Sequence, residues 1–404
     1  MKKFFVLMAV ACVGSGSMAV AQNDNEGYKF TDQKILKYTP VQNQASSGTC
    51  WSFSGAAFLE SEILRLKGEE VNLSEMYIVR CALLDKAEKF VRMHGKVNFS
   101  AGGATHDVTN VFKKYGALPE EVYTGLNYGT TSHRHAELEK VLEGYMNGII
   151  ENPNKKLSTA WKAGFEGILD AYLGKVPETF TYKGKEYTPM SFAESLGLNM
   201  DDYVSFTSFT HHPFYEQFAV EVPDNWAWGL SYNVPIDEFA ELFSNAIDKG
   251  FTIYWASDVS EKGFAYNRGF AVIPDADVTI MNDSEKARWT ALTESEKQKE
   301  LYKLDKPGAE KKITQELRQE AFDNYETTDD HGMQIVGTAT DQIGNKYYKV
   351  KNSWGTEQIY GGFFYASEPF VLYKTTNMVI HKDAVPKSIL KKLADKAKKT
   401  NPFE

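Results

Sequence analysis

The sequence predicts an α+β fold, in which a helical first part and a helical middle precede a strand-rich final third. Apolar residues recur at helical spacing over residues 50–66, and again over residues 135–149 and 157–172. Short runs rich in Val, Ile, Tyr and Phe, separated by turn residues, follow between residues 331 and 381. The chain has 404 residues, of which 42% are hydrophobic, so it can bury a substantial core.

The first residues have the pattern of a signal peptide. Two lysines precede an apolar run over residues 4–13, and residues 19–21 (Ala-Val-Ala) offer a small-x-small cleavage site. We therefore expect export to the periplasm or secretion, with Gln22 as the new N-terminus. Lipid attachment at Cys12 is the alternative. The apolar run is shorter than the ~20 residues that span a bilayer, and no later segment is long and apolar enough, so no stable membrane insertion is expected.

The rest of the chain divides into four parts. Residues 22–128 form an N-terminal segment and a helical lobe, residues 129–235 a helical insertion, residues 236–385 a strand-rich lobe, and residues 386–404 a tail. The insertion should contain one short hairpin, around Gly184. A charged helical stretch is expected within the strand-rich lobe, and a basic helix in the tail.

Charge and cysteine content exclude some classes of function. The net charge is −9 and becomes more negative when the leader is removed, so neither nucleic acid nor an anionic membrane surface is favoured as a partner. After cleavage only Cys50 and Cys81 remain, which is no disulfide framework. They could pair with each other, or one of them could be a reactive thiol.

The segment from Gln44 to Trp51 combines the features of an acyl-transfer site. Cys50 stands where a helix begins, and a helix N-terminus stabilises the thiolate, which is the attacking form. Gly48 lets the backbone approach a substrate closely. The amide N–H of Cys50 and the side chain of Gln44 can donate to the oxyanion of a tetrahedral intermediate. A buried structural cysteine is the ordinary alternative, but the whole segment favours a nucleophile.

Among the eight histidines, His331 is the best candidate for the base. It opens a predicted strand, a turn follows around residues 341–345, and a return strand ends at Asn352. The midpoint between His331 and Asn352 falls in this turn, so a hairpin brings the two side by side. Asn352 can then hold one ring nitrogen while the other faces the thiol.

The other histidines lie in loops, in charged segments or at a strand end. No pair of them has the spacing of a helical zinc motif, and the cysteines are far from them in sequence. We therefore expect neither a metal nor another cofactor.

Two segments resemble motifs of the papain family of cysteine peptidases. Residues 44–51 resemble its Gln…Cys-Trp nucleophile motif, and residues 352–355 match its Asn-Ser-Trp-Gly motif. In that family the tryptophan shields the Asn–His hydrogen bond from water, so the resemblance gives this role to Trp354. Residues 73–76 are similar to its Leu-Ser-Glu-Gln stretch.

One departure indicates a branch of that family. Ser47 stands where papain-type enzymes usually have a second cysteine, and Cys81 stands at the position of its partner, so Cys81 should be a buried free thiol. Cys50 and His331 are about 280 residues apart, against roughly 130–150 in papain-type enzymes. Together these features resemble bleomycin hydrolase and aminopeptidase C, which carry a helical insertion.

The resemblance implies a papain-like two-lobe fold with a large helical insertion, assembled as a homo-oligomer, specifically a hexameric ring. It implies a cysteine aminopeptidase that acts on peptide substrates through a thioester. Gly102 and Gly103 resemble the glycine pair that binds the substrate backbone, although a simple turn explains them equally well. In that branch the C-terminal carboxylate holds the substrate's amine, which gives Glu404 this role; a solvated basic helix is the alternative.

Two other functions fit the same residues. The protein could be a papain-like endopeptidase, which would cleave peptides whose N-terminus is blocked. In a different class, it could be a catalytically silent peptide-binding protein on a peptidase scaffold. All four expected catalytic positions (Gln44, Cys50, His331 and Asn352) are filled, which argues against a silent protein.

Overall fold

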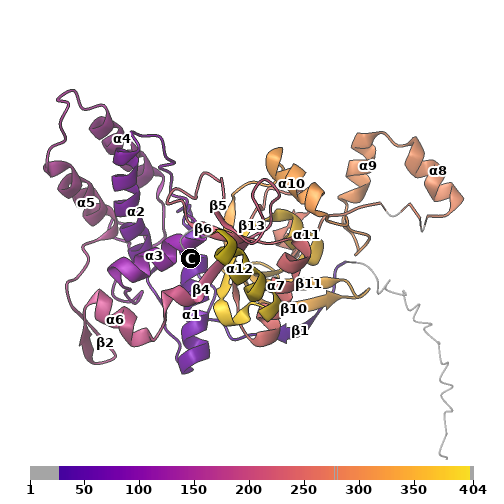
Figure 1. Cartoon of the computed structure of the whole chain (residues 1–404), viewed down its shortest axis with the longest axis horizontal. Coiled ribbons are helices and arrows are strands. Elements are labelled where there is room, and N and C mark those ends of the chain that lie inside the picture. The colour runs from indigo at the N-terminus through magenta and orange to yellow at the C-terminus, as the bar shows by residue number, and fades with distance from the viewer. Residues whose placement is uncertain (1–26, 277, 280, 401–404) are drawn as a thin grey trace, which may run out of the picture.

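A computed structural model describes residues 27–276, 278–279 and 281–400 of the chain. Figure 1 shows a helical part, drawn in indigo and magenta, beside a part built on a large sheet. Two short helices, α8 and α9, project from the sheet part on the side away from the helical part. The expected signal peptide, Gln22 and Cys12 lie outside the described residues.

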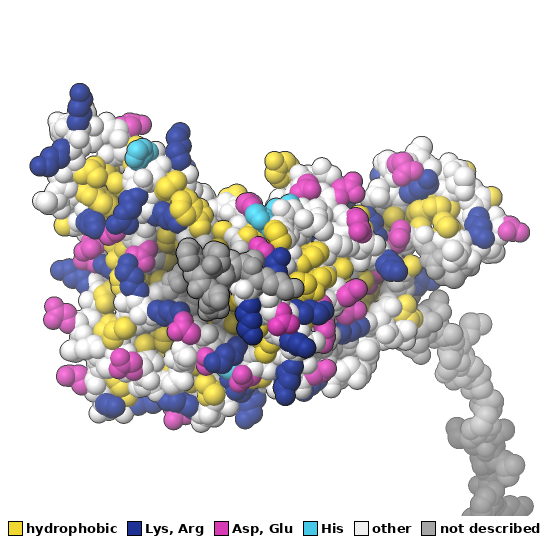
Figure 2. All heavy atoms as spheres, in the orientation of Figure 1, with side chains coloured by type: hydrophobic (Ala, Val, Ile, Leu, Met, Phe, Trp, Pro, Cys, Tyr) yellow, Lys and Arg dark blue, Asp and Glu magenta, His cyan; other side chains and the backbone are white. Residues whose placement is uncertain are grey.

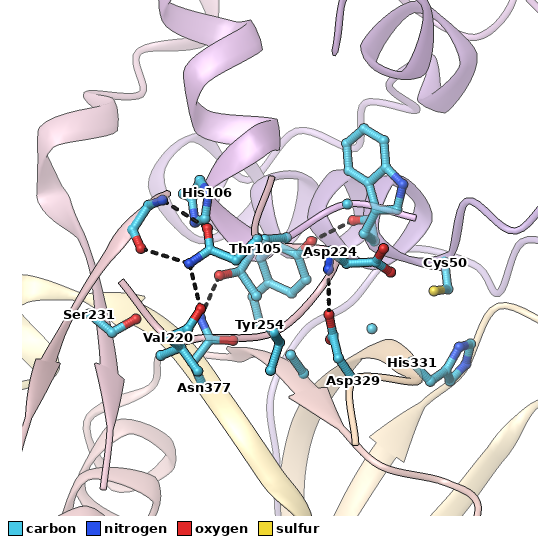
Figure 3. A pocket seen from close by; sticks show the side chains of 18 of the residues that line it. Cys50, Thr105, His106, Val220, Asp224, Ser231, Tyr254, Asp329, His331 and Asn377 are labelled. Atoms are coloured by element: carbon cyan, nitrogen blue, oxygen red, sulfur yellow. Dashed lines mark hydrogen bonds between the residues drawn. The ribbon is translucent and has the colours of Figure 1, made fainter. Parts of the chain in front are cut away.

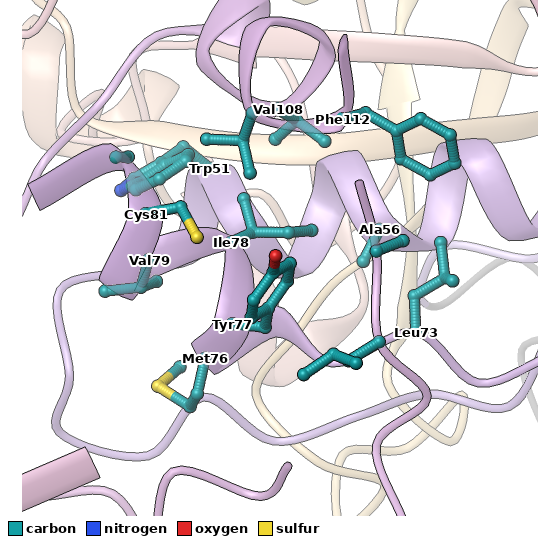
Figure 4. Close-up of a cluster of buried hydrophobic side chains, with 14 of the residues drawn as sticks. Trp51, Ala56, Leu73, Met76, Tyr77, Ile78, Val79, Cys81, Val108 and Phe112 are labelled. Atoms are coloured by element: carbon teal, nitrogen blue, oxygen red, sulfur yellow. The ribbon is translucent and has the colours of Figure 1, made fainter. Parts of the chain in front are cut away.

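The helical part is formed by α1 (Cys50–Lys67), α2 (Glu75–Arg92), α3 (Thr105–Tyr115), α4 (Ala136–Ile150), α5 (Ala160–Leu173) and α6 (Pro189–Leu196). Helix α1 ends at Gly68, whose φ of 67° is left-handed and therefore suits glycine. Helix α2 begins after Ser74, whose side chain accepts the Tyr77 N–H. Apolar faces of α1, α2 and α3 share one buried core, which Figure 4 shows around Ile78 and Val108.

The second part is a mixed sheet of eleven strands among the described residues. Its order is β5-β6-β4-β13-β7-β10-β11-β12-β9-β8, and β1 pairs with β10. The strands are β1 (Phe30–Ile35), β4 (Tyr203–Thr207), β5 (Gln217–Ala219), β6 (Leu230–Asn233), β7 (Ile253–Ser257), β8 (Phe264–Ala265), β9 (Phe270–Ala271), β10 (His331–Asp341), β11 (Lys346–Lys351), β12 (Phe363–Ser367) and β13 (Thr375–His381).

Six helices of the described residues belong to this part, of which α8 and α9 project away from the sheet and bury no residue. They are α7 (Ile236–Lys249), α8 (Asp283–Ala291), α9 (Glu294–Leu301), α10 (Gln315–Asp323), α11 (Glu368–Lys374) and α12 (Lys387–Thr400). The predicted basic tail helix is α12, but one side of it is apolar: Ile389 and Leu393 are buried in the core of the sheet part. It is therefore a packed helix and not a freely solvated one.

Strand β10 connects the two parts of the molecule. It pairs with β1, β7 and β11, and its first seven residues are all buried. Gly332, near its start, lies against α1: a Cβ there would come within 2.6 Å of Ser54 Oγ and 3.1 Å of Trp51 Cα. This close approach places the first residue of β10 beside the first residue of α1.

The predicted helical insertion is only partly helical. Residues 129–199 contain α4, α5, α6 and the expected hairpin, β2 (Phe180–Tyr182) with β3 (Lys185–Tyr187). Residues 203–233, however, contribute β4, β5 and β6 to the main sheet. The prediction was wrong here because these strands are only three to five residues long and their pairing is set by β13, far along the chain.

Charged side chains are mixed over the face seen in Figure 2. Lys and Arg, in dark blue, alternate with Asp and Glu, in magenta, over both parts of the molecule. In the described part of the chain, no helix is both long and apolar enough to cross a membrane.

Candidate active site

The nucleophile segment forms a tight loop that leads into α1. Cys50 is the first residue of the helix and is partly exposed, whereas Trp51 is buried. Gly48 has a φ of 62°, and a Cβ there would come within 3.0 Å of the Ala101 Cβ. Ser47 is fully buried and its hydroxyl lies 2.5 Å from that of Thr49. The loop thus holds Cys50 at the helix N-terminus, as the sequence predicted.

His331 and Asn352 are in contact, as the hairpin interpretation predicted. The Nε2 of His331 donates to Asn352 Oδ1 over 2.7 Å, so Nδ1 is left unprotonated as the candidate base. The strands are antiparallel as expected, although a register shift between Ile335 and Gly337 offsets the simple pairing. The ring of Trp354 lies 4.6 Å from that of His331 and covers it.

Gln44 is held in place by two hydrogen bonds to Ser353. Its carbonyl Oε1 accepts the Ser353 hydroxyl over 2.6 Å, and its backbone N–H donates to the Ser353 carbonyl. The side-chain oxygen is therefore occupied, and the amide NH₂ group remains as the donor. Ser353 follows Asn352 directly, so one strand end positions both side chains.

Burial opposes charge on both reacting groups. Burial raises the pKa of Cys50 to about 11, the backbone N–H groups of Gly332 and Trp51 act in the opposite direction, and the charges of Asp224 and Asp329 add to the rise. Burial also lowers the pKa of His331 to about 4, against the raising effect of the Asn352 hydrogen bond. Burial therefore opposes the thiolate–imidazolium ion pair, whereas the helix N-terminus favours the thiolate.

One pocket contains both reacting side chains. Cys50, Gly103, Asp224, Asp329 and His331 are among the residues that line it, and Figure 3 shows Cys50 and His331 as neighbours at one side of it. The remaining predicted residues surround this pair: Asn352 lies behind His331, Trp354 covers that ring, and Gln44 is joined to the same strand end through Ser353. Glu404 lies outside the described residues.

A side chain at Gly102 or Gly103 would have to displace a neighbouring side chain. A Cβ at Gly102 would lie 1.9 Å from Asp224 Oδ2, and one at Gly103 would lie 2.8 Å from Trp51 and 2.9 Å from Asp107 Oδ2. The carbonyl of Gly102 accepts a hydrogen bond from Lys86 Nζ. Close packing at the edge of the pocket therefore explains the glycine pair.

The sequence-based reasoning missed Asp224 and Asp329. Asp329 had a usable signal, because two consecutive acids directly precede the candidate base His331. Asp224 had none, since it lies in the insertion and reaches the pocket only through the fold. Its backbone N–H donates to Asp329 Oδ2 over 3.2 Å, a bond drawn in Figure 3.

Cys81 is a free, buried thiol, as expected. It belongs to α2 and lies in the core of the helical part, as Figure 4 shows, and burial raises its pKa to about 12. His211 and His212 of the insertion both hydrogen-bond Glu221.

Comparisons with known proteins agree with this geometry. Residues 28–163 match the papain family of cysteine proteases, and residues 290–404 match the peptidase C1-like family. Aminopeptidase C of Lactococcus lactis subsp. lactis is 24% identical over 91% of this chain and 86% of its own length. Bleomycin hydrolase of Rattus norvegicus is 24% identical over 87% of this chain and 82% of its own length.

A solved structure has the same fold. The crystal structure of PepW from Lactobacillus rhamnosis HN001 superimposes with a TM-score of 0.65 at 21% identity, covering 91% of this chain and 86% of that one. Both family models are of papain-like cysteine peptidases, and the chain is similar over most of its length to aminopeptidase C and bleomycin hydrolase.

Proposed function

We propose that the protein is a cysteine aminopeptidase that releases N-terminal residues from peptides. The observation that carries the chemistry is the placement of Cys50 at a helix start in the same pocket as His331, whose ring is held by Asn352. The N-terminal specificity follows the relatives named aminopeptidase C and G, with which the chain aligns over most of its length.

Each catalytic residue has one role in the proposed reaction. Nδ1 of His331 takes the thiol proton as the sulfur of Cys50 attacks the scissile carbonyl. Gln44 and the Cys50 amide N–H hold the oxyanion of the tetrahedral intermediate. The imidazolium then protonates the leaving amine, and a thioester remains. Water, deprotonated by the same imidazole, releases the amino acid and restores the thiol.

The proposal extends to location and assembly. The N-terminal pattern of lysines, apolar run and small-x-small site supports export, with lipid attachment at Cys12 as the alternative. The resemblance to the bleomycin hydrolase branch supports a homo-oligomer, specifically a hexamer. No cofactor enters the proposed reaction.

The deciding experiment uses the purified mature protein and pairs of fluorogenic substrates that differ only in N-acetylation. An aminopeptidase cleaves the free-amine member of each pair and leaves the acetylated member nearly untouched. Comparable cleavage of both would identify an endopeptidase instead. Absence of turnover, together with no labelling by a thiol-directed epoxide inhibitor, would identify a silent peptide-binding protein.

A further inference from the structure

We propose that Asp224 and Asp329 form the subsite that binds the α-ammonium group of the substrate. This inference rests on the proposed aminopeptidase function and names the group that makes it specific. The sequence-based expectation gave the role to Glu404; the described pocket contains two carboxylates of its own beside the nucleophile.

The position of the two carboxylates is the first support. In an N-terminal residue the ammonium nitrogen is two bonds from the scissile carbonyl, so a specific anion must lie in the same pocket as the attacking sulfur. Asp224 and Asp329 line the pocket of Cys50 and His331, and Figure 3 shows their side chains beside that pair. Their charges act on the Cys50 sulfur strongly enough to raise its pKa.

The two carboxylates also lack a cation. Asp224 Oδ1 accepts from Asn98 and Ser100, and Asp329 Oδ2 accepts the Asp224 N–H. Among the described residues, Asp224 Oδ2 and Asp329 Oδ1 accept no hydrogen bond, and neither carboxylate forms an ion pair with Lys or Arg. Burial raises the pKa of both carboxyl groups. The charge of Lys86 lowers the pKa of Asp224 without pairing with it, whereas the charge of Asp224 raises the pKa of Asp329. An ammonium group between the two carboxylates would reduce this repulsion.

The other charged groups nearby are already engaged. Asp330 also lines the pocket, but its carboxylate accepts from Thr328, Val259 and Ser260. Lys86 donates to the carbonyl groups of Ser100 and Gly102, which holds its Nζ beneath the loop. This leaves the pair of Asp224 and Asp329 as the free anion of the pocket.

Asp224 also limits how far a substrate can extend. Its Oδ2 lies where a side chain on Gly102 would be, at 1.9 Å from that Cβ position, so the carboxylate is packed directly onto Gly102. A peptide that continued beyond the cleaved residue along this edge would meet the carboxylate. The same group therefore attracts a free amine and obstructs an acylated one.

Asparagine variants test the assignment, with a charge-matched control. Asp224→Asn and Asp329→Asn keep the shape and remove one charge each, whereas Glu221→Gln removes a charge from an exposed side chain in the same segment as Asp224. Because a hydrogen bond to a charged group contributes about 1.5–3 kcal/mol, each Asn variant should lose roughly 10- to 100-fold in kcat/KM for free-amine substrates, mostly through KM. Glu221→Gln should behave as wild type.

A second readout separates binding from structural damage. Since both charges raise the pKa of Cys50, the Asn variants should react with iodoacetamide at neutral pH at least as fast as wild type. A disrupted pocket would instead slow this reaction. If a variant does not fold, inhibition of the wild-type enzyme tests the same assignment. Alaninamide should compete with substrate, and N-acetylalaninamide should not.

The outcomes distinguish this assignment from the proposed function. Unchanged free-amine preference in both Asn variants, or equal inhibition by the two amides, would overturn the assignment and leave the aminopeptidase intact. Deletion of residues 401–404 could instead abolish the free-amine preference while the Asn variants keep it. That result would show that the tail binds the substrate amine, and it would also overturn the assignment. A wild type that cleaves free and acetylated substrates equally would overturn the aminopeptidase proposal itself.

Discussion

At the scale of single residues, the reaction depends on transfer of the Cys50 thiol proton to His331. Cys50 has a pKa raised to about 11 and His331 one lowered to about 4, so the proton must pass between them as attack begins. Cys50→Ala should abolish hydrolysis while the far-UV circular dichroism and melting temperature stay unchanged. Cys81→Ser is the control, because that thiol lies in the core, away from the pocket; strong loss of turnover in a folded Cys81→Ser protein would contradict its structural role.

His331 and Asn352 should contribute unequally to kcat. His331→Ala removes the group that moves the proton, and general base catalysis typically contributes on the order of 10²–10⁴-fold. Asn352→Ala removes only the 2.7 Å hydrogen bond that orients the ring. We expect kcat to fall less in Asn352→Ala than in His331→Ala, measured on the same substrate at the same pH. The reverse order would show that the ring orientation matters more than the proton transfer.

The charge state of Asp329 should make substrate affinity depend on pH. Burial and the neighbouring charges of Asp224, Asp330 and Asp107 raise its pKa to about 7, against the Asp224 N–H, which lowers it. A raised carboxyl pKa means that Asp329 gains a proton as pH falls through about 7, and a protonated carboxyl attracts an ammonium weakly. KM for free-amine substrates should therefore rise below pH 7, and this rise should vanish in Asp329→Asn. A KM independent of pH between 5 and 8 would argue against an ionised Asp329 in the subsite.

At the scale of elements, a buried arginine joins helices to the sheet. Arg318 in α10 is fully buried and donates to the carbonyl groups of Ser208, Leu372 and Thr375 over 2.6–2.7 Å. Ser208 follows β4, Leu372 lies in α11, and Thr375 begins β13. The Arg318 guanidinium also lies 4.5 Å from the ring of Phe209.

Removing this arginine should destabilise the sheet part. Arg318→Met keeps the apolar stem but removes a donor from three carbonyl groups, of which that of Ser208 keeps a long bond of 3.4 Å from Gln315 Nε2. Each buried group left unsatisfied costs about 1–3 kcal/mol. We expect the free energy of unfolding to fall by at least about 3 kcal/mol in urea titrations. Arg288→Met on the exposed helix α8 is the matched control and should change it by less than about 0.5 kcal/mol. Equal stability of the two variants would refute a structural role for Arg318.

At the scale of the whole molecule, we expect the mature chain to begin at Gln22. The lysines, the apolar run and the Ala-Val-Ala site predict cleavage after Ala21. Intact mass spectrometry of the protein from its native host measures the outcome directly. A mass that includes residues 1–21, or a lipid-modified chain beginning at Cys12, would contradict this prediction.

The sequence by itself determined the features that depend on short stretches of chain. Cys50 at a helix start, Gln44 in the preceding loop, and His331 facing Asn352 across a hairpin are set by neighbours within a few tens of residues, so local patterns and family motifs identified them. The helices α4 and α5 and the strands β10 to β13 followed from periodicity for the same reason.

Only the tertiary structure decided the features that join distant segments. Strands β4, β5 and β6 are too short to be predicted from a local pattern. They form through successive pairings, in which β4 pairs with β13, β6 with β4 and β5 with β6. Asp224 and Asp329 meet because the insertion folds back over the start of β10. Their burial, and with it the charge of the pocket, follows from that long-range packing, which no local pattern of residues encodes.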